Sequence, residues 1–292
     1  MRFPNLFTMF QPHFFVEVLT LHMNFTEARD VAAKIAYNAG MHIRSRMGHG
    51  QDYETSEKGI NDYVTTVDRE AEEIIVDGLT EAFPSSTIMA EEASSNLPDR
   101  LPADDLLWII DPIDGTTNFM HSLSPFAVSI GLASGGAVKT GVIYEVTHDE
   151  MYTAIEGAGA YLDGRRLRVS STRTTEASLV ATGFPYRRFD HINEYMETLR
   201  TFLTNVRGIR RNGAASIDLA RVASGQFDGF YESGLHPWDV AAGALLVEEA
   251  GGVVTDYRGE NNPVMRRQML ATNGHVHDDL LMLLESLKDC FS

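Results

Sequence analysis

Apolar residues recur at helical spacing in several stretches of the chain. From Ala28 to Ala39 they repeat every three or four positions, which predicts an amphipathic helix with Thr26 as its N-cap and a break at Gly40. Similar spacing, bounded by proline or glycine, predicts further helices. These cover residues 68–83, 191–206, 210–224, 237–250 and 278–288.

The strands are predicted by shorter and more continuous apolar runs. Leu106–Ile110 is five apolar residues long, too short to span a membrane and too continuous for a half-exposed strand, so we expect a strand buried on both faces that ends at Asp111. Runs at 126–132, 137–146 and 150–155, separated by turn residues, predict an antiparallel meander. Further strands are expected at 85–90, 178–181 and 252–257. This order indicates a mixed α/β or α+β fold rather than a simple βαβ repeat.

Composition narrows the class of protein. A chain of 292 residues that is 43% hydrophobic can bury a large core, in one domain or in two halves. A net charge of −17 argues against a general nucleic-acid binder. The chain has a single cysteine, Cys290, so no intrachain disulfide can form, which favours a reducing, cytoplasmic setting. Cys290 is the third residue from the C-terminal end of the sequence, where it is no plausible nucleophile.

The first 22 residues differ from the rest. They are apolar but are interrupted by prolines and polar residues and lack a cleavage site, so they predict neither a signal peptide nor a transmembrane helix. We interpret 1–22 as a dispensable or disordered extension and 23–292 as the folded domain, with halves of about 23–175 and 176–292. A polar stretch at 48–59 predicts a mobile loop.

The candidate chemistry begins directly after the apolar strand, in the sequence DPIDGTTN. Asp111 and Asp114 flank Pro112, which stiffens the turn, and Gly115 lets the backbone approach a ligand closely. Two carboxylates beside the amino end of a helix suit a hard divalent cation next to a phosphate. The alternative is structural: Asp111 caps a turn and Asp114 caps the following helix.

Two separated motifs resemble the inositol monophosphatase family of magnesium-dependent, lithium-sensitive phosphatases. The first is WIIDPIDGTTN, and the second is H-x-W-D-x-A-A-G followed by E-A-G-G, from His236 to Gly252. The resemblance runs from about Met23 to the C-terminus and implies a layered αβαβα sandwich. Within this family, the chain resembles the bacterial extragenic-suppressor branch, which includes proteins that associate with the transcription machinery.

The resemblance assigns roles to residues whose ordinary interpretation is structural. Asp68 could simply cap a helix, Glu91 could belong to a solvated acidic pair with Glu92, and Asp239 could be a first-turn acid favoured by the helix dipole. The family motif instead implies that Asp68 pairs with Thr116 to orient the attacking water, and that Glu91 binds metal. The implied metal ligands are Glu91, Asp111, the Ile113 carbonyl, Asp114 and Asp239, an oxygen-only set that suits two or three Mg²⁺ ions.

Further residues are implied to bind the substrate. Phosphate would lie on the amides of Gly115, Thr116 and Thr117, and the pocket would include Gly213, Ala215, Glu232, Asp114 and Asp239. In the family the residue matching Glu232 accepts hydrogen bonds from ring hydroxyls, although a surface glutamate is the ordinary interpretation. His236 and Trp238 are interpreted as packing residues.

The implied reaction is hydrolysis of a small phosphate monoester, with myo-inositol 1-phosphate as the expected substrate. Fructose 1,6-bisphosphate, a nucleotide phosphate or histidinol phosphate are alternative substrates that would use the same acidic residues. A regulatory role in a transcription complex is the alternative of a different class. We expect a homodimer that binds no membrane and does not bind nucleic acid directly.

Overall fold

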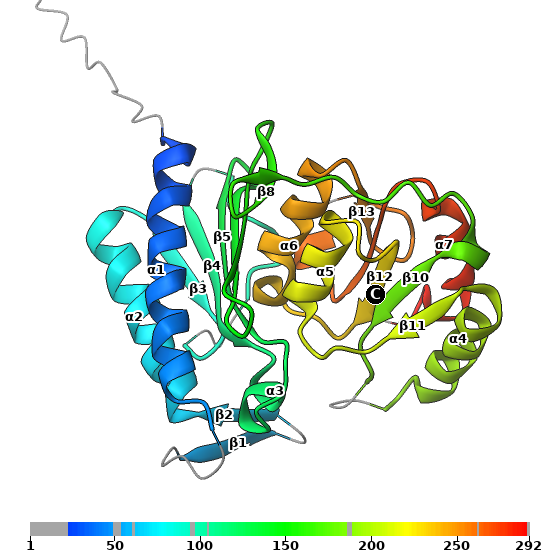
Figure 1. Cartoon of the computed structure of the whole chain (residues 1–292), viewed down its shortest axis with the longest axis horizontal. Coiled ribbons are helices and arrows are strands. Elements are labelled where there is room, and N and C mark those ends of the chain that lie inside the picture. Colours follow the sequence, from blue (N-terminus) through cyan, green and yellow to red (C-terminus); the bar gives the residue numbers. More distant parts are fainter. Residues whose placement is uncertain are drawn as a thin grey trace, which may run out of the picture.

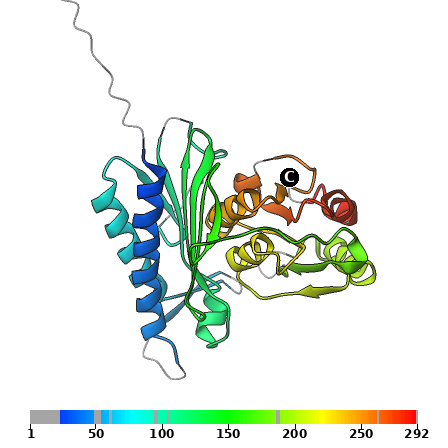
Figure 2. The same ribbon diagram turned by 45° about the horizontal axis from the view of Figure 1, so that its top comes forward.

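The computed structural model describes residues 23–48, 54–59, 62–93, 97–103, 105–185, 189–261 and 263–290. Within these ranges two large sheets and three layers of helices alternate (Figure 1). Helices α1 and α2 cover the first sheet, α5 and α6 lie between the sheets, and α4 and α7 cover the second sheet; Figure 2 shows the same layers from another direction. The predicted αβαβα sandwich is confirmed.

The outer layer consists of α1 (Phe25–Ser45) and α2 (Thr66–Ala82), whose buried residues form one core with the first sheet. The N-cap of α1 is Asn24 rather than Thr26, because the Asn24 side chain accepts from the Thr26 and Glu27 amides. The helix also continues through Gly40. A Cβ there would lie 2.3 Å from the Tyr144 ring, so this glycine permits close packing and does not break the helix.

The first sheet has seven strands in the order β3-β4-β5-β6-β7-β8-β9. They are β3 (Thr87–Ala90), β4 (Leu107–Asp114), β5 (Ala127–Ser134), β6 (Ala137–Glu145), β7 (Glu150–Ile155), β8 (Gly159–Leu162) and β9 (Arg165–Arg166). β3 and β4 are parallel, and the strands from β4 to β9 form the predicted antiparallel meander. The predicted end of β4 at Ile110 is wrong: pairing with β5 continues to Asp114 across an irregularity that accommodates Pro112.

The middle layer consists of α5 (Ala215–Ala223) and α6 (Pro237–Glu249). α6 begins at Pro237 as predicted, and nearly all of its residues are buried, because it contacts strands of both sheets. A helix that is apolar all round belongs in such an interior position. It therefore connects the two halves of the chain through one continuous core.

The second sheet has five strands in the order β11-β10-β12-β14-β13. They are β10 (Leu179–Thr182), β11 (Gly208–Arg210), β12 (Gly229–Ser233), β13 (Val253–Thr255) and β14 (Gln268–Thr272). β10 is parallel to both β11 and β12, whereas β12 and β14 are antiparallel. The sheet is covered by α4 (Ile192–Asn205) and α7 (His277–Leu283). The predicted terminal helix to residue 288 is too long, since a 3₁₀ turn (Glu285–Leu287) follows α7.

The remaining elements are short. A hairpin of β1 (Thr55–Gly59) and β2 (Asp62–Thr65) occupies part of the predicted mobile loop, and residues 49–53 of that loop lie outside the described residues, as does the extension 1–22. The others are α3 (Thr116–Met120) and 3₁₀ turns at Thr175–Ala177 and Pro263–Met265. Among the described helices, none is both long and apolar enough for a membrane span.

Candidate active site

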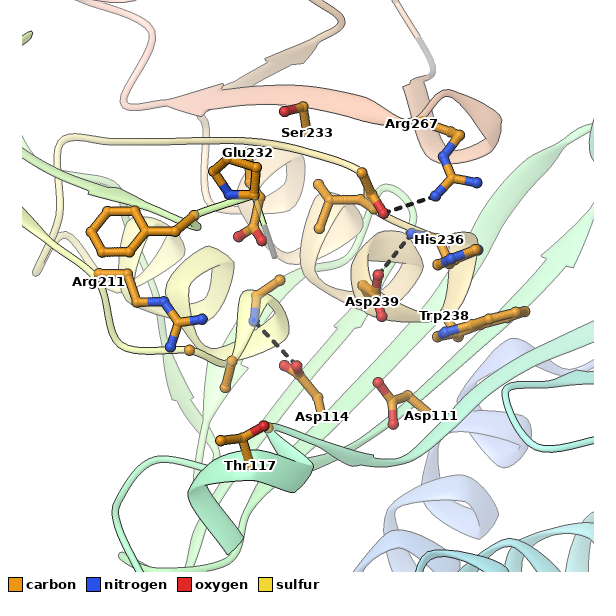
Figure 3. Close-up of a pocket in the computed structure, with 18 of the residues that line it drawn as sticks. Asp111, Asp114, Thr117, Arg211, Glu232, Ser233, His236, Trp238, Asp239 and Arg267 are labelled. Carbon is orange, nitrogen blue, oxygen red and sulfur yellow. Dashed lines mark hydrogen bonds between the residues drawn. The ribbon is translucent and has the colours of Figure 1, made fainter. Parts of the chain in front are cut away.

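The candidate site lies where parallel strands from both sheets end at one cavity. β3 and β4 end there in the first sheet, and β10 and β12 end there in the second. Ligands bind beyond the carboxyl ends of strands in many α/β proteins. The cavity has a volume of about 680 Å³ (Figure 3). The predicted residues that line it are Glu91, Asp111, Ile113, Asp114, Gly115, Thr116, Thr117, Gly213, Ala215, Glu232 and Asp239.

Carboxylates at one end of the cavity influence one another strongly. Burial raises the pKa of Asp111 well above its ordinary value. The negative charge of Glu91, followed by the charges of Asp114 and Asp239, raises the Asp111 pKa further, and Glu91 also forms a hydrogen bond with it. These four acids come from the ends of β3 and β4 and from the first turn of α6. Their mutual repulsion would be offset by a bound cation.

The orientation of two of these carboxylates is fixed mainly by backbone amides. Asp114 accepts hydrogen bonds from the amides of Ala215 at 3.2 Å and Ser216 at 2.7 Å, and from the Ser216 hydroxyl at 2.5 Å. One oxygen of Asp239 accepts from the amide of His236 at 2.7 Å, as Figure 3 shows. These contacts aim the acids at the cavity before any ligand binds. They also tie β4 in one half of the chain to α5 in the other.

The structural alternative for DPIDGTTN is half correct. Asp111 does cap a local turn, since its Oδ1 accepts from the Ile113 amide at 3.0 Å. Asp114 does not cap the following helix. The N-cap of α3 is Gly115, which has a left-handed φ of 94° and no side-chain cap. A Cβ at Gly115 would lie 3.1 Å from the Pro125 carbonyl and 3.3 Å from the Gly213 carbonyl, so this glycine permits close approach of two loops.

The contact expected between Asp68 and Thr116 is present. The Thr116 hydroxyl lies 3.0 Å from Asp68 Oδ1 and 3.0 Å from the Ile113 carbonyl, either of which can accept its proton. Asp68 is not the N-cap of α2. Thr65 occupies that position, and Asp68 completes a capping box by accepting from the Thr65 amide at 2.8 Å. Asp68 therefore contributes to the helix start and lies behind Thr116, which lines the cavity.

Asparagine side chains hold the second-half loop against α3. Asn118 Nδ2 donates to the carbonyls of Pro125 at 2.7 Å and Asn212 at 2.8 Å, and Asn212 Nδ2 donates to Asp218 at 2.6 Å. Burial raises the pKa of Asp218 to about 7, opposed by the bond from Asn212. These contacts position Gly213 and the start of α5 beside the cavity.

Glu232 faces the cavity from the end of β12, as expected for a substrate-binding residue (Figure 3). Burial raises the pKa of its carboxyl well above the ordinary value, and the charges of Asp218, Asp239 and Asp114 raise it further. The guanidinium of Arg211 acts in the opposite direction. Glu232 is therefore not the solvated surface charge that its sequence context alone suggested.

Several cavity residues were not predicted. Phe184, Tyr195 and Arg211 form one wall, with the Arg211 guanidinium 5.8 Å from the centre of the Phe184 ring. Cys290, which the sequence placed on a free tail, also lines the cavity. No spacing in the sequence brings these residues together, since they come from four separate segments. His236 and Trp238 stack face to face at 4.8 Å, which agrees with a packing role.

The residues of the site fit a hard cation by their chemistry. Carboxylate and carbonyl oxygens surround the acidic end of the cavity, and oxygen ligands are those that Mg²⁺ prefers. Across the described ranges, no three His, Cys, Asp or Glu side chains are already gathered as a ligand group. Asp114 keeps its hydrogen bonds to the start of α5, and Asp239 keeps its hydrogen bond to the His236 amide.

Comparison with known proteins gives a consistent relationship. The sequence profile of the inositol monophosphatase family matches residues 24–289. The Nus factor SuhB of Pseudomonas aeruginosa is 42% identical over 258 residues, which cover 88% of this chain and 95% of that protein. The Nus factor SuhB of Escherichia coli K12 is 41% identical over 247 residues, covering 85% of this chain and 91% of that protein.

Solved structures agree over the same range. The extragenic suppressor protein suhB from Bartonella henselae has a TM-score of 0.82 and 40% identity, covering 89% of this chain and 98% of that chain. The inositol monophosphatase from Anabaena (Nostoc) sp. has a TM-score of 0.78 and 36% identity, covering 90% of this chain and 97% of that chain. An IMPase/NADP phosphatase complexed with NADP and Ca²⁺ is only 22% identical at a TM-score of 0.78, which shows a shared fold alone.

Proposed function

Because this chain belongs to the inositol monophosphatase family, we propose that it hydrolyses a small phosphate monoester, with myo-inositol 1-phosphate as its preferred substrate, in a Mg²⁺-dependent reaction. The observation that carries the proposal is the meeting of acidic strand ends at one cavity whose lining includes Thr116, the partner of the buried Asp68. The acids supply cation ligands, and the pair supplies a place for the proton of an attacking water.

The proposed ligands follow the family pattern. Glu91, Asp111 and the Ile113 carbonyl would hold one Mg²⁺, and Asp111, Asp114 and Asp239 would hold a second. A third, weaker ion would lie near Glu91. When bound, Mg²⁺ would supply the positive charge that offsets the phosphate and the leaving oxygen. Since Asp114 and Asp239 each keep a backbone hydrogen bond, their carboxylates are partly oriented in advance.

The proton path uses groups of the chain itself. A water in the cavity can donate to Thr116 Oγ1, while the Thr116 hydroxyl donates to Asp68 Oδ1 at 3.0 Å. Asp68 is 1% exposed, so the proton that it receives is shielded from bulk solvent. Correct positioning of a base of this kind contributes about 10²–10⁴-fold to the rate of a reaction.

Phosphate and polyol would bind on opposite sides of the scissile bond. The phosphate would contact the amides of Gly115, Thr116 and Thr117, with Gly213 close by. The polyol hydroxyls would donate to Glu232 and Asp114 and accept from the Ala215 amide. The partly buried position of Glu232 in the cavity lining supports this proposal, because a carboxylate that is partly shielded from water makes stronger hydrogen bonds to a substrate hydroxyl.

The proposal is tested by phosphate release from a panel of esters. Inositol 1-phosphate, fructose 1,6-bisphosphate, a nucleoside monophosphate and histidinol phosphate are compared with Mg²⁺, with added Li⁺ and with EDTA. We expect the highest kcat/KM for inositol 1-phosphate, inhibition by Li⁺ and loss of activity in EDTA. Unchanged turnover in EDTA would refute the metal-dependent mechanism, whereas a different best substrate would replace only the inositol assignment.

A pair of matched variants controls for folding. Asp111→Asn removes a central acid, and we expect loss of nearly all activity. Asp163→Asn makes the same change in a surface turn, where φ of 48° suits asparagine and the bond to the Met151 amide can be kept. If both variants lost activity equally, the effect of Asp111→Asn would not identify the site.

A role in a transcription complex is a second candidate function. It is favoured by relatives that carry the name Nus factor SuhB and match this chain over more than nine tenths of their own length. The test is co-purification of transcription proteins with the Asp111→Asn variant, in which binding can be separated from catalysis. We also propose a cytoplasmic homodimer, which light scattering combined with size-exclusion chromatography measures directly.

A further inference from the structure

Gly183 lies directly beside the carboxylate of Glu232. A Cβ built at Gly183 would be 1.9 Å from Glu232 Oε1, 2.0 Å from Cδ and 2.3 Å from Oε2. No side chain larger than hydrogen fits at this position while Glu232 stays where it is. Gly183 does not have a positive φ, so the position needs glycine for space and not for backbone conformation.

The register of the second sheet produces this contact. β10 and β12 are parallel, and Thr182, the last residue of β10, pairs with Tyr231 of β12. Gly183 follows directly after β10, whereas Glu232 is still part of β12 and pairs with Met269 of β14, so Gly183 lies beside Glu232 at the cavity. The contact joins residues 49 positions apart, which explains why the sequence pattern does not reveal it.

The backbone at Gly183 is held more firmly than the glutamate side chain. Its carbonyl accepts hydrogen bonds from the Tyr195 hydroxyl at 2.8 Å and the Thr182 hydroxyl at 3.2 Å. Tyr195 is 5% exposed and Thr182 is fully buried, so these donors are fixed within the core. An added methyl group would therefore displace the Glu232 side chain, which has three rotatable bonds, rather than the chain at Gly183.

We propose that Gly183 is a specificity-determining position, because the space beside it sets where the Glu232 carboxylate stands in the cavity and hence how a polyol is recognised. This inference rests on the proposed function. Gly183 acts through Glu232 and is a positioning residue. A substrate with several hydroxyls depends on that placement, whereas an ester with an aromatic leaving group depends on it much less.

A double-mutant cycle tests the inference. The variants are Gly183→Ala, Glu232→Ala and the two together, and the readout is the ratio of kcat/KM for inositol 1-phosphate to kcat/KM for p-nitrophenyl phosphate. A charge-assisted hydrogen bond contributes about 1.5–3 kcal/mol, so we expect Gly183→Ala to lower the ratio roughly tenfold or more. In the Glu232→Ala background the clash is absent, and Gly183→Ala should change the ratio by less than about twofold.

Two further variants sharpen the cycle. Gly183→Ala combined with Glu232→Asp shortens the acid by one methylene group, which should recover part of the ratio lost in Gly183→Ala. Gly208→Ala is the matched control in the adjacent strand β11, because a Cβ there meets only ordinary contacts at 3.5 and 3.6 Å. We expect the control to leave both esters near wild-type rates.

The outcomes separate this inference from the proposed function. Equal loss on both esters, or a further large loss when Gly183→Ala is added to Glu232→Ala, would overturn the role of Gly183. The melting temperature gives an independent check, since Gly183→Ala should lower it more when Glu232 is present than when it is absent. Absence of Mg²⁺-dependent hydrolysis in the wild-type protein would instead refute the proposed function and, with it, the specificity role.

Discussion

Asp114→Asn tests two roles of one carboxylate, the anchoring of α5 that the structure shows and the binding of Mg²⁺ that we propose. Asp114 anchors α5 by accepting from the Ala215 amide and from the Ser216 amide and hydroxyl. It is also a proposed Mg²⁺ ligand. Asparagine keeps the shape and one acceptor oxygen, but its amide group would face the donor N–H of Ser216. The variant therefore loses a buried charge-assisted hydrogen bond as well as a negative charge.

The two losses have different sizes and different dependence on Mg²⁺. Losing a hydrogen bond to a charged group costs about 1.5–3 kcal/mol. Removing a charge close to Asp111 relieves repulsion, because burial and the neighbouring acids raise the pKa of Asp111. We therefore expect the free energy of unfolding without metal to fall by no more than about 1–2 kcal/mol.

The stabilisation of the protein by Mg²⁺ should fall much more in Asp114→Asn than the stability without metal does. A cation at a hundred times its Kd stabilises a folded protein by about 2.7 kcal/mol, and hundredfold weaker binding at the same concentration leaves about 0.4 kcal/mol. For a chain of this size, 1 kcal/mol corresponds to a shift in Tm of roughly 2–4 °C. We expect Mg²⁺ to raise the wild-type Tm by roughly 5–10 °C and the Asp114→Asn Tm by about 1 °C.

Differential scanning fluorimetry over a Mg²⁺ titration, beside phosphate release, measures both effects. Ser216→Ala is the matched control, because it removes a hydrogen bond to Asp114 and keeps the charge. That variant should lower Tm without metal and preserve most of the Mg²⁺ response. A wild-type Mg²⁺ response and near-normal turnover in Asp114→Asn would show that Asp114 is only an anchor for α5.

Two other predictions follow from the same geometry. Asp68→Asn and Thr116→Val should each lower kcat by about a hundredfold or more. The double variant should have nearly the same kcat as either single variant, because the two residues act as one unit, and additive losses would contradict this. For Asp218, burial raises the pKa of the folded state to about 7 from 3.8. The folded state therefore binds the proton more tightly than the unfolded state, and the contribution of Asp218 to the free energy of unfolding falls as pH rises from about 4 to 7. The Tm of Asp218→Asn should fall less than the wild-type Tm between pH 5 and pH 7, and parallel curves would show that another group causes the fall.

The local features of the fold were predictable where one sequence signal determined them. The apolar run 106–110 predicted β4, which begins at Leu107, and Pro237 and Gly251 flanked the predicted α6. The end of β4 was misjudged because pairing with β5 carries the strand past Pro112, and a partner strand is not visible in the sequence of one strand. β14 was not predicted, because it depends on pairing with β12 and β13, which its own sequence does not reveal.

The candidate site also has residues that the sequence predicted and residues that it did not. Glu91, Asp111, Asp114 and Asp239 were predicted because the sequence around them resembles that of a family, and all four line the cavity. Asp68 was predicted in the same way but does not line the cavity, and its contact with the site runs through Thr116. The wall of Phe184, Tyr195 and Arg211 was not predicted, since it depends on how α4 and the loop before α5 pack at the ends of the second sheet. The space that Gly183 leaves for Glu232 depends on strand register. Register and packing are properties of pairs of distant segments.

The buried acids at the ends of β3 and β4 also bear on how such a chain can change over time. Burial and neighbouring negative charges disfavour the ionised form of Asp111, so the folded protein loses stability by keeping these acids together. A descendant that served only as a binding partner would gain stability by replacing Asp111 with asparagine, because this change removes the buried charge and its repulsion by the neighbouring acids while it keeps an acceptor for the Ile113 amide. A chain that keeps Glu91, Asp111, Asp114 and Asp239 around one cavity therefore retains a cost that folding alone does not repay. Catalysis is the use that would select for it.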